Sequence, residues 1–202
     1  MDAVIIDSGG ANLASLQFAL ERLGAQATVT ADAHAIQSAA RVVLPGVGSA
    51  ADAMQRLRRS GVAELLPKLR QPVLGICLGM QLLFERSAEG DTECLGLLPG
   101  SVRRLEAVRG RPVPHMGWNR LTGARADPLL AGIGPDEYFY FVHSYAVPAS
   151  AVTLAQVHYG QALSAVVRRD NFWGAQFHPE RSAAAGARLL GNFLSLTWPL
   201  GE

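Results

Sequence analysis

The chain has 202 residues, 49% of them hydrophobic and 17% charged, a composition that predicts one folded domain over residues 1–202 and excludes a disordered protein. Its 18 lysine and arginine residues nearly balance its 17 aspartate and glutamate residues, so a nucleic-acid partner is not expected. Because no apolar run reaches the length of a membrane span, no signal peptide opens the chain and only two cysteines occur, we expect a cytoplasmic protein without membrane anchor or disulfide scaffold.

The first half of the chain alternates short apolar runs with amphipathic stretches. Predicted strands cover residues 3–7, 26–30, 41–44 and 71–77, and a glycine-rich loop follows the third of them. Predicted helices cover residues 11–25, 51–61 and 78–87. Strands that alternate with helices indicate βαβ units, and therefore an α/β fold with an open, mostly parallel central sheet flanked by helices.

From about residue 92 the pattern changes to strands joined by turns. These strands are predicted at residues 101–107, 138–148, 152–160 and 163–179, and a closing helix is predicted at residues 182–198. We expect an antiparallel extension of the same sheet, which would make the sheet a mixed one.

A cysteine stands between two glycines where the fourth predicted strand meets a predicted helix, in Gly75-Ile76-Cys77-Leu78-Gly79. A G-x-C-x-G pattern at such a junction has the form of a nucleophile elbow, in which a sharp turn leaves the central side chain exposed above the sheet. The helix N-terminus behind Cys77 would favour a thiolate, and the Leu78 N–H would be one donor of an oxyanion hole. The pentapeptide alone is equally consistent with a cysteine buried for packing.

Five histidines are available as a base for such a cysteine, and His178 has the most specific context, WGAQFHPERS. Pro179 disfavours the helical region for His178 and holds it extended. In an extended segment residues i and i+2 project to the same side, so the Glu180 carboxylate can accept a proton from one ring nitrogen. Taken alone, His178 is more simply interpreted as a structural histidine at a strand end; together with the elbow, the motif favours catalysis.

The PGVGS segment (45–49) follows a predicted strand and should lie at the same sheet edge as Cys77. Gly46 and Gly48 let the backbone bend, so that an N–H of the Gly46–Val47 segment can face a developing oxyanion. The segment lacks the spacing of the phosphate-binding glycine motifs. A plain turn is the alternative interpretation of the segment by itself.

The motifs PGVGS, GICLGMQ and QFHPE occur in this order, and they give the chain a resemblance to the class I glutamine amidotransferases over essentially its whole length. Within that family, VPHMGWN (113–119) and YFYFVHSY (138–145) resemble the glutaminase subunits of imidazole glycerol phosphate synthase in histidine biosynthesis. The resemblance implies a flavodoxin-like fold and hydrolysis of glutamine through a cysteine thioester. It also implies a heterodimer with a (β/α)8-barrel cyclase subunit that receives the ammonia, and no metal or cofactor.

The resemblance assigns roles by position. Cys77 would be the nucleophile, His178 the base and acid, and Glu180 the group that orients the imidazole. Oxyanion donors would come from Leu78, Gly46 and Val47. Glutamine contacts would come from Gly48, Gln81, His143, Ser144 and Tyr145. The face that meets the cyclase would contain Met116, Trp118, Asn119, Tyr138 and Arg181. His115 would be structural or interfacial. Arg181 stands where the family usually has lysine, which leaves a salt bridge to the partner open.

Two other functions stay open. A free-standing Cys-His-Glu hydrolase or peptidase of the same fold would be active without a partner. A catalytically silent regulatory module is the other, although the intact set of Cys77, His178 and Glu180 argues against it. If the resemblance holds, we expect the Gly46–Val47 peptide to point away from the site at rest and to turn when the synthase binds its own substrate.

Overall fold

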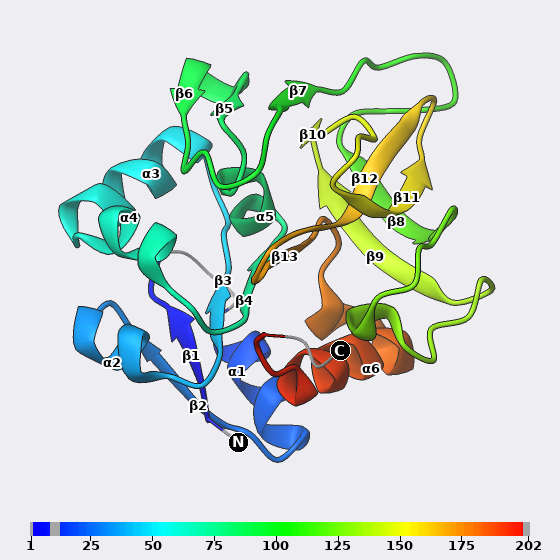
Figure 1. The fold of residues 1–202 in the computed structure, drawn as a ribbon. Helices are drawn as coiled ribbons and strands as arrows, with labels where there is room; N and C mark the ends of the chain where they lie inside the picture. Colours follow the sequence, from blue (N-terminus) through cyan, green and yellow to red (C-terminus); the bar gives the residue numbers. More distant parts are fainter. Residues whose placement is uncertain (1, 9–12, 200–202) are drawn as a thin grey trace.

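The computed structural model describes residues 2–8 and 13–199, and within them the chain forms a seven-stranded central sheet (Figure 1). The strand order is β11 (Thr153–His158), β12 (Ala162–Arg169), β13 (Phe172–Ala175), β4 (Val73–Ile76), β3 (Val42–Leu44), β1 (Asp2–Ile6), β2 (Gln26–Thr30). The strands from β13 to β2 run parallel, whereas β12 and β11 are added antiparallel. The predicted α/β fold, with a mostly parallel sheet and an antiparallel extension, is confirmed.

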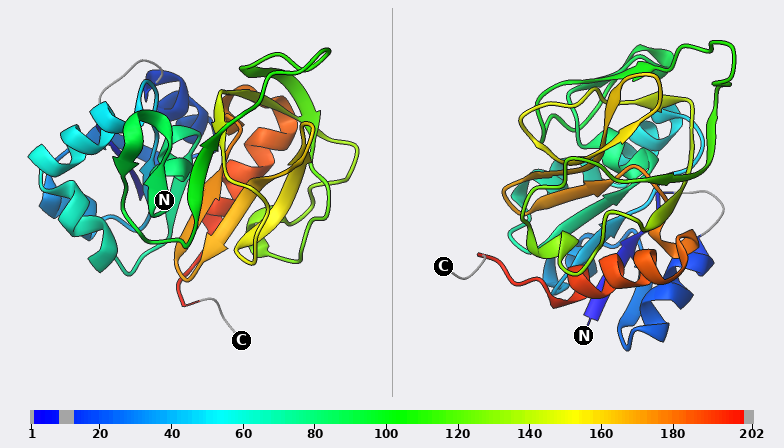
Figure 2. Two further views of the ribbon diagram at one scale, coloured as in Figure 1. Left: turned by 90° about the horizontal axis from the view of Figure 1, so that it is seen from above. Right: turned by 90° about the vertical axis from the view of Figure 1, so that its right-hand side faces the viewer.

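Helices cover both faces of this sheet, as the views in Figure 2 show. Along β1, Ala3 and Ile5 enter one core while Val4 and Ile6 enter the other, because successive strand residues point to opposite faces. The first core is covered by α1 (Leu13–Arg22) and α6 (Ala183–Ser195). The second is covered by α2 (Ala33–Ser38), α3 (Ala50–Arg59), α4 (Val62–Leu65) and α5 (Leu78–Leu82). The short 3-10 helices are η1 (Leu66–Lys68), η2 (Glu89–Asp91), η3 (Pro128–Leu130) and η4 (Pro179–Arg181).

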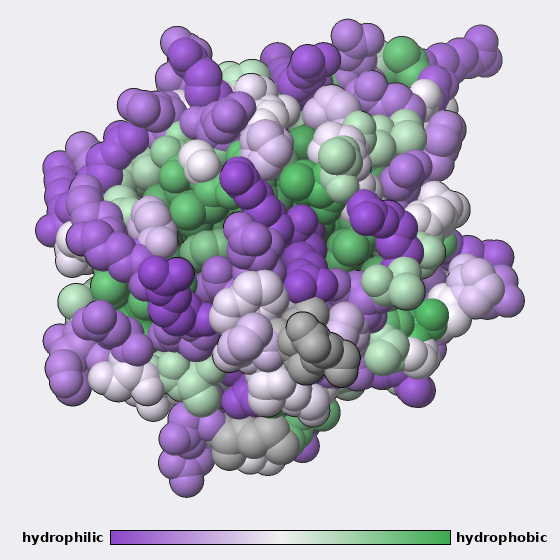
Figure 3. Space-filling view, viewed as in Figure 1, coloured by the Kyte–Doolittle hydropathy of each residue, from purple (hydrophilic) through white to green (hydrophobic). Residues whose placement is uncertain are grey.

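The outer surface follows from this layering. Figure 3 shows that the rim of this face is mostly hydrophilic, whereas apolar patches lie nearer its centre and are interrupted by hydrophilic residues. Within residues 2–8 and 13–199, none of the helices combines the length and apolar content that a transmembrane segment requires.

The register of the parallel strands brings three strand ends to one edge. Leu44 of β3 pairs with Gly75 of β4, and Ala175 of β13 pairs with Ile76 of β4. The residues that follow these strands therefore emerge side by side: the glycine loop after β3, Cys77 after β4 and the segment leading to His178 after β13. Open α/β sheets hold their ligand sites at this carboxyl edge.

Two segments predicted for the extension of the central sheet, 101–107 and 138–148, form other sheets instead. β8 (His115–Arg120), which was not predicted as a strand, pairs antiparallel with β9 (Tyr138–His143). A further sheet has the order β10 (Tyr145–Ala146), β7 (Ser101–Arg104), β5 (Arg86–Ser87), β6 (Thr92–Glu93). The helix predicted at 78–87 ends at Leu82 because the chain beyond it is drawn into β5, where Arg86 pairs with Glu93 and Ser101.

Candidate active site

Cys77 occupies a strained turn between β4 and α5. Its backbone has φ 54° and ψ −112°, in the positive-φ region that L-residues rarely adopt, and its N–H donates to the Ala175 carbonyl at 2.8 Å. Gly75 and Gly79 are needed because a side chain at either position would clash with neighbouring backbone. A Cβ on Gly75 would lie 2.7 Å from the Gly79 carbonyl oxygen, and one on Gly79 would overlap the Leu44 carbonyl oxygen. The turn places Cys77, which packs at the edge of the core, in the lining of a pocket.

His178 lies beside Cys77 and is held from behind. Its Nδ1 is 2.9 Å from Glu180 Oε1, and its ring lines the same pocket as Cys77. The His178 N–H donates to the Tyr140 carbonyl at 3.0 Å, and the Ser182 hydroxyl donates to the His178 carbonyl at 2.7 Å. The predicted extended conformation at the residue before Pro179 is present, with φ −99° and ψ 97°. The fold thus aligns a thiol, an imidazole and a carboxylate.

The partners of His178 determine its charge. Burial lowers the pKa of His178, but hydrogen bonds to Cys77 and Glu180 and electrostatic attraction to both groups outweigh burial and raise the pKa to about 10. The ring is therefore an imidazolium at neutral pH. A protonated imidazole beside a sulfur can stabilise a thiolate and can later donate its proton to a leaving group.

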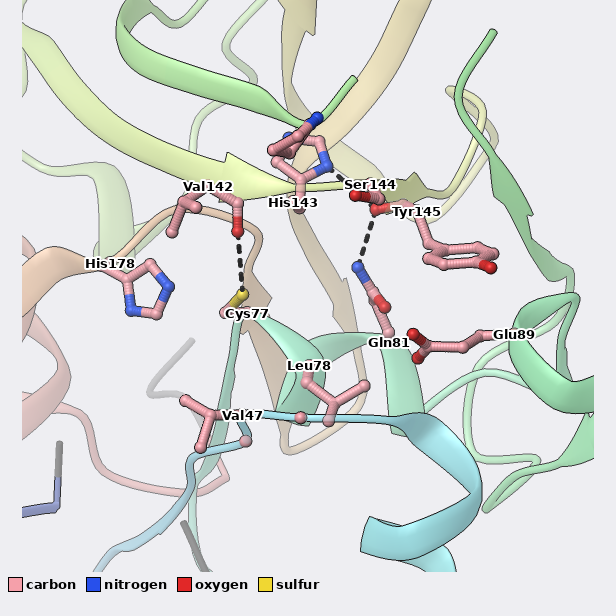
Figure 4. Close-up of a pocket in the computed structure, with 13 residues that line it drawn as sticks. Val47, Cys77, Leu78, Gln81, Glu89, Val142, His143, Ser144, Tyr145 and His178 are labelled. Carbon is pink, nitrogen blue, oxygen red and sulfur yellow. Dashed lines mark hydrogen bonds between the residues drawn. The ribbon is translucent and has the colours of Figure 1, made fainter. Parts of the chain in front are cut away.

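These groups open onto a pocket of about 370 Å³, drawn in Figure 4. This volume lies in the range of small-molecule sites. The predicted site residues that line it are Gly46, Val47, Gly48, Cys77, Leu78, Gln81, His143, Ser144, Tyr145 and His178. Glu89, Pro114 and Val142 complete the lining. The structure thus brings together residues from separated segments of the chain, with Glu180 behind His178.

The loop after β3 packs tightly against the elbow. The Ser8 hydroxyl donates to the Pro45 carbonyl at 2.9 Å, and a Cβ on Gly46 would lie 2.7 Å from the Gly79 nitrogen and 2.8 Å from the Leu78 Cβ. A bulky residue at Gly46 would therefore displace the elbow as well as the loop. Gly48 has φ +88°, a conformation that favours glycine, and an added Cβ there would meet open space.

Two polar residues at the site were not predicted from the sequence. Glu89 extends a carboxylate into the pocket (Figure 4), and its Oε2 accepts from the Ala50 N–H at 2.8 Å. The Gln176 Nε2 lies 3.9 Å from the Cys77 sulfur, and its Oε1 accepts from Gln81 Nε2 at 3.0 Å. The position of Gln176 at the start of the QFHPE motif was a signal for this residue, whereas the turn that contains Glu89 carries no local signal of a site.

Two further histidines lie near this pocket, one in its wall and one behind it. His143 Nδ1 lies 2.9 Å from the Tyr145 carbonyl oxygen, and His143 Nε2 lies 3.0 Å from His115 Nδ1. Burial lowers the pKa of each ring to about 4. His115 does not line the pocket but lies behind His143.

The residues predicted to meet a partner divide between two faces. Met116, Trp118 and Tyr138 are exposed by 63%, 53% and 45% on the outer face of β8 and β9. Asn119, predicted for the same face, turns its amide inward to His115, because neighbouring strand residues alternate between faces. Arg181 is exposed in η4, directly after the His178–Glu180 motif.

The outer face of β8 and β9 is continuous with the pocket. Met116 pairs with Val142 in the ladder, and Val142 lines the pocket with its carbonyl oxygen 3.9 Å from the Cys77 sulfur. In the described part of the chain, no group of three His, Cys, Asp or Glu side chains is arranged to hold a metal ion.

Comparisons with known proteins agree with this geometry. Residues 4–196 match the family model "Glutamine amidotransferase class-I". The chain is 54% identical over 198 residues to the imidazole glycerol phosphate synthase subunit HisH of Xanthomonas axonopodis pv. citri, covering 98% of this chain and 99% of that one. It is also 54% identical over 195 residues to the HisH subunit of Xylella fastidiosa (strain Temecula1), covering 96% and 98%.

Solved structures share the fold at low identity. A glutamine amidotransferase crystal structure superposes with a TM-score of 0.73 at 20% identity, covering 95% of this chain and 96% of that one. The structure of PurLQS from Thermotoga maritima superposes with a TM-score of 0.69 at 19% identity, covering 96% and 97%.

Proposed function

The chain belongs to the class I glutamine amidotransferase family, and from this premise we propose that it is the glutaminase subunit of an imidazole glycerol phosphate synthase. It hydrolyses glutamine to glutamate and ammonia and delivers the ammonia to a separate cyclase subunit in histidine biosynthesis, in the cytoplasm. The observation that carries the proposal is the alignment of Cys77, His178 and Glu180 at the rim of one pocket. The 54% identity to HisH subunits over almost the whole chain supports this particular synthase.

The pocket offers complementary groups to both ends of glutamine. The Glu89 carboxylate is suited to the α-ammonium group, and the backbone of Ser144–Tyr145 is suited to the amino and carboxylate groups. Gln81 and Gly48 complete the wall between these groups and the sulfur. The side-chain amide then points toward Cys77.

The first half of the reaction forms a thioester. The Cys77 sulfur attacks the amide carbon, and the negative charge moves to the amide oxygen. N–H groups of Leu78 and of the Gly46–Val47 segment receive that oxyanion. As the tetrahedral intermediate collapses, the C–N bond breaks and the His178 imidazolium donates its proton to the departing nitrogen, which leaves as ammonia.

The second half releases glutamate. The imidazole of His178, now neutral, takes a proton from a water molecule that attacks the thioester carbon. The C–S bond breaks, glutamate leaves, and the sulfur anion and imidazolium are restored. Glu180 holds the ring through Nδ1, so that the other nitrogen faces the reacting atoms throughout.

A resting state follows if the loop after β3 hides one oxyanion donor. Each such donor is worth about 100- to 1,000-fold in rate, so a turned peptide at Gly46–Val47 would silence the site. Gly48 is the hinge we assign to that turn, because it has open space and a positive φ. Cyclase substrate binding would favour the active orientation.

The cyclase, a (β/α)8 barrel, docks on the outer face of β8 and β9 through Met116, Trp118 and Tyr138. Aromatic and methionine side chains are enriched at such interfaces. Because this face borders the pocket mouth, docking there would pass the ammonia into the partner and keep it from escaping into water. The products of the partner are imidazole glycerol phosphate and an aminoimidazole carboxamide ribotide.

The test mixes the full chain with the cyclase and measures glutamate release with and without the cyclase's ribonucleotide substrate. The proposal expects release that depends on the partner and rises with the ribonucleotide. The Cys77→Ser variant is the matched control, because it keeps the shape of the elbow and removes the thiol.

Each alternative function has its own result in this assay. Glutamate release that is the same with and without the cyclase would indicate a free-standing hydrolase. No release under any condition would indicate a silent module. An alkylated Cys77 that leaves glutamate release unchanged would refute the mechanism itself.

A further inference from the structure

We propose that His143 and His115 are positioning residues for the Ser144–Tyr145 segment that holds glutamine. They form a relay of two neutral imidazole rings, with its far end held by Asn119. The inference rests on the proposed glutaminase function, and it assigns to the two rings a task separate from the chemistry at His178.

The hydrogen-bond partners determine which nitrogen of each ring carries the proton. The Tyr145 carbonyl oxygen can only accept, so the His143 Nδ1 that lies 2.9 Å from it must donate. In a neutral ring the His143 Nε2 is then an acceptor, and His115 Nδ1, 3.0 Å away, is its donor. Both rings therefore have the Nδ1–H tautomer, and the relay has one direction.

Asn119 holds the far end in the same direction. Its Oδ1 accepts from the Arg120 N–H at 2.9 Å, so its Nδ2 is the group that faces the ring. That Nδ2 lies 3.4 Å from His115 Nε2 and 3.3 Å from the His158 carbonyl oxygen. Because its side chain turns inward, Asn119 can hold His115, which a side chain facing a partner could not do.

Packing prevents His115 from rotating. Its ring lies between Phe141, at a centroid distance of 5.0 Å, and Tyr159, at 4.1 Å, with interplanar angles of 22° and 24°. The Tyr159 hydroxyl is itself held by the Pro112 carbonyl at 2.6 Å. The low pKa of both histidines, caused by burial, keeps the two rings neutral at pH 7.

The near end of the relay acts on the backbone that contacts glutamine. The Tyr145 carbonyl oxygen accepts from His143 Nδ1 and also from Gln81 Nε2, at 2.8 Å. The Ser144 carbonyl accepts from the Leu105 N–H at 2.9 Å. With both carbonyls held, the orientation of the intervening peptide in the pocket is set. Loss of the His143 donor would leave Gln81 Nε2 as the remaining side-chain donor to the Tyr145 carbonyl, so the peptide would be held less firmly and glutamine binding would weaken without a change at the sulfur or His178.

The first test compares two substitutions of one ring. His115→Phe keeps the stacking between Phe141 and Tyr159 but removes the donor to His143. His115→Asn removes the stacking but retains an N–H at the place of Nδ1. In the complex with the cyclase, His115→Phe should raise KM for glutamine about ten-fold, the effect of one buried hydrogen bond, with kcat within about two-fold of wild type. His115→Asn should keep KM within about three-fold of wild type, because it retains that hydrogen bond.

Two kinetic results would overturn the relay. One is a wild-type KM in His115→Phe, because the donor would then be dispensable. The other is an equal rise of KM in both variants, because packing alone would then explain the role of His115.

The second test needs no substitution and no turnover. Long-range ¹H–¹⁵N spectra of the histidine rings in the wild-type full chain should show both His115 and His143 as neutral Nδ1–H tautomers at pH 7. A charged His143, or a neutral His143 with its proton on Nε2, would refute the relay even if the His115→Phe variant failed to fold. Failure of the proposed function would appear differently, as wild-type protein that releases no glutamate with the cyclase while these spectra stay as expected.

Discussion

Two histidine sites lie at the same pocket and differ in charge: His178 is an imidazolium, whereas His143 and His115 behind it are neutral. Burial lowers the pKa of every one of these rings, yet the pKa of His178 is raised to about 10 while those of His115 and His143 fall to about 4. His178 faces a thiol and a carboxylate, whereas the other two rings face each other, a backbone carbonyl and an amide. Burial keeps a histidine neutral unless its partners outweigh it, so the thiol and the carboxylate make His178 a proton donor while the other two rings remain neutral supports.

The largest effect should come from removing the charge that sustains His178. Glu180→Gln keeps the size of the side chain but removes the carboxylate, so the pKa of His178 should fall. We expect kcat for glutamine hydrolysis in the complex to drop about 100- to 1,000-fold, within the range of general acid–base catalysis. The pH profile of kcat/KM is the measurement. Since His178 must be protonated to donate to ammonia, activity falls as pH rises through its pKa, and this alkaline limb should move to lower pH in the variant.

Glu64→Gln, which changes a carboxylate on α4 far from the pocket lining, is the matched control and should behave as wild type. An alkaline limb that stays in place in Glu180→Gln would show that Glu180 does not set the charge of His178.

The next effect concerns stability against pH and uses both sites. His178 binds its proton more tightly when folded, so its stabilisation is complete below pH 6.5 and is lost as pH rises toward 10. His115 and His143 bind protons less tightly when folded, so their stabilisation is complete above pH 6.5 and is lost as pH falls toward 4. Urea unfolding should thus give a maximum near pH 6.5, with a loss of a few kcal/mol on each side.

Variants separate the two limbs of this stability curve. Glu180→Gln should reduce the alkaline limb and leave the acidic one. His115→Asn should reduce the acidic limb, in which His143 retains its part, and leave the alkaline one. If either variant changed both limbs equally, the two histidine sites would not titrate independently, and the comparison between them would fail.

A smaller effect is expected outside both sites, at the docking face. Trp118→Ala should weaken binding of the cyclase by about 30-fold, corresponding to roughly 2 kcal/mol for an aromatic hot spot. Calorimetric titration of the cyclase into the chain measures it. Phe18→Ala, which removes another exposed aromatic residue, 57% exposed on α1, is the control and should leave the affinity unchanged. Unchanged affinity in Trp118→Ala would place the docking face elsewhere.

The smallest effect should come from the carboxylate at the other end of the pocket. Glu89→Gln keeps an acceptor for the Ala50 N–H but loses the charge that we assign to the α-ammonium of glutamine. KM for glutamine should rise about ten-fold with kcat little changed, because a charge-assisted hydrogen bond becomes a neutral one. Steady-state kinetics of the variant measure this change in KM. Glu93→Gln, which alters an exposed carboxylate outside the pocket, is the control. A lower kcat at wild-type KM would contradict the assignment.

Short stretches of sequence were sufficient to predict the charged site, formed by Cys77, His178 and Glu180. The turn at Cys77 needs glycines within two residues on either side, and the approach of Glu180 to His178 needs only an extended segment before a proline. Both are short-range constraints, so they can be read from a few adjacent residues. The parallel order of β3 and β4 follows from the alternation of strands and helices. The place of β13 does not: the stretch predicted as one strand at 163–179 is split into the hairpin of β12 and β13, and β13 pairs parallel with β4.

The neutral site, formed by His115, His143 and Asn119, was decided by the tertiary structure alone. Whether His115 meets His143, and whether Asn119 turns inward, depends on the register of β8 against β9, and a slip by one residue would reverse every side chain of β8. The entry of Glu89 into the pocket depends likewise on the path of the chain through η2. Contacts between distant segments have no local signature, because they are set by which strands pair and in which register, and that choice is made by the packing of the whole chain.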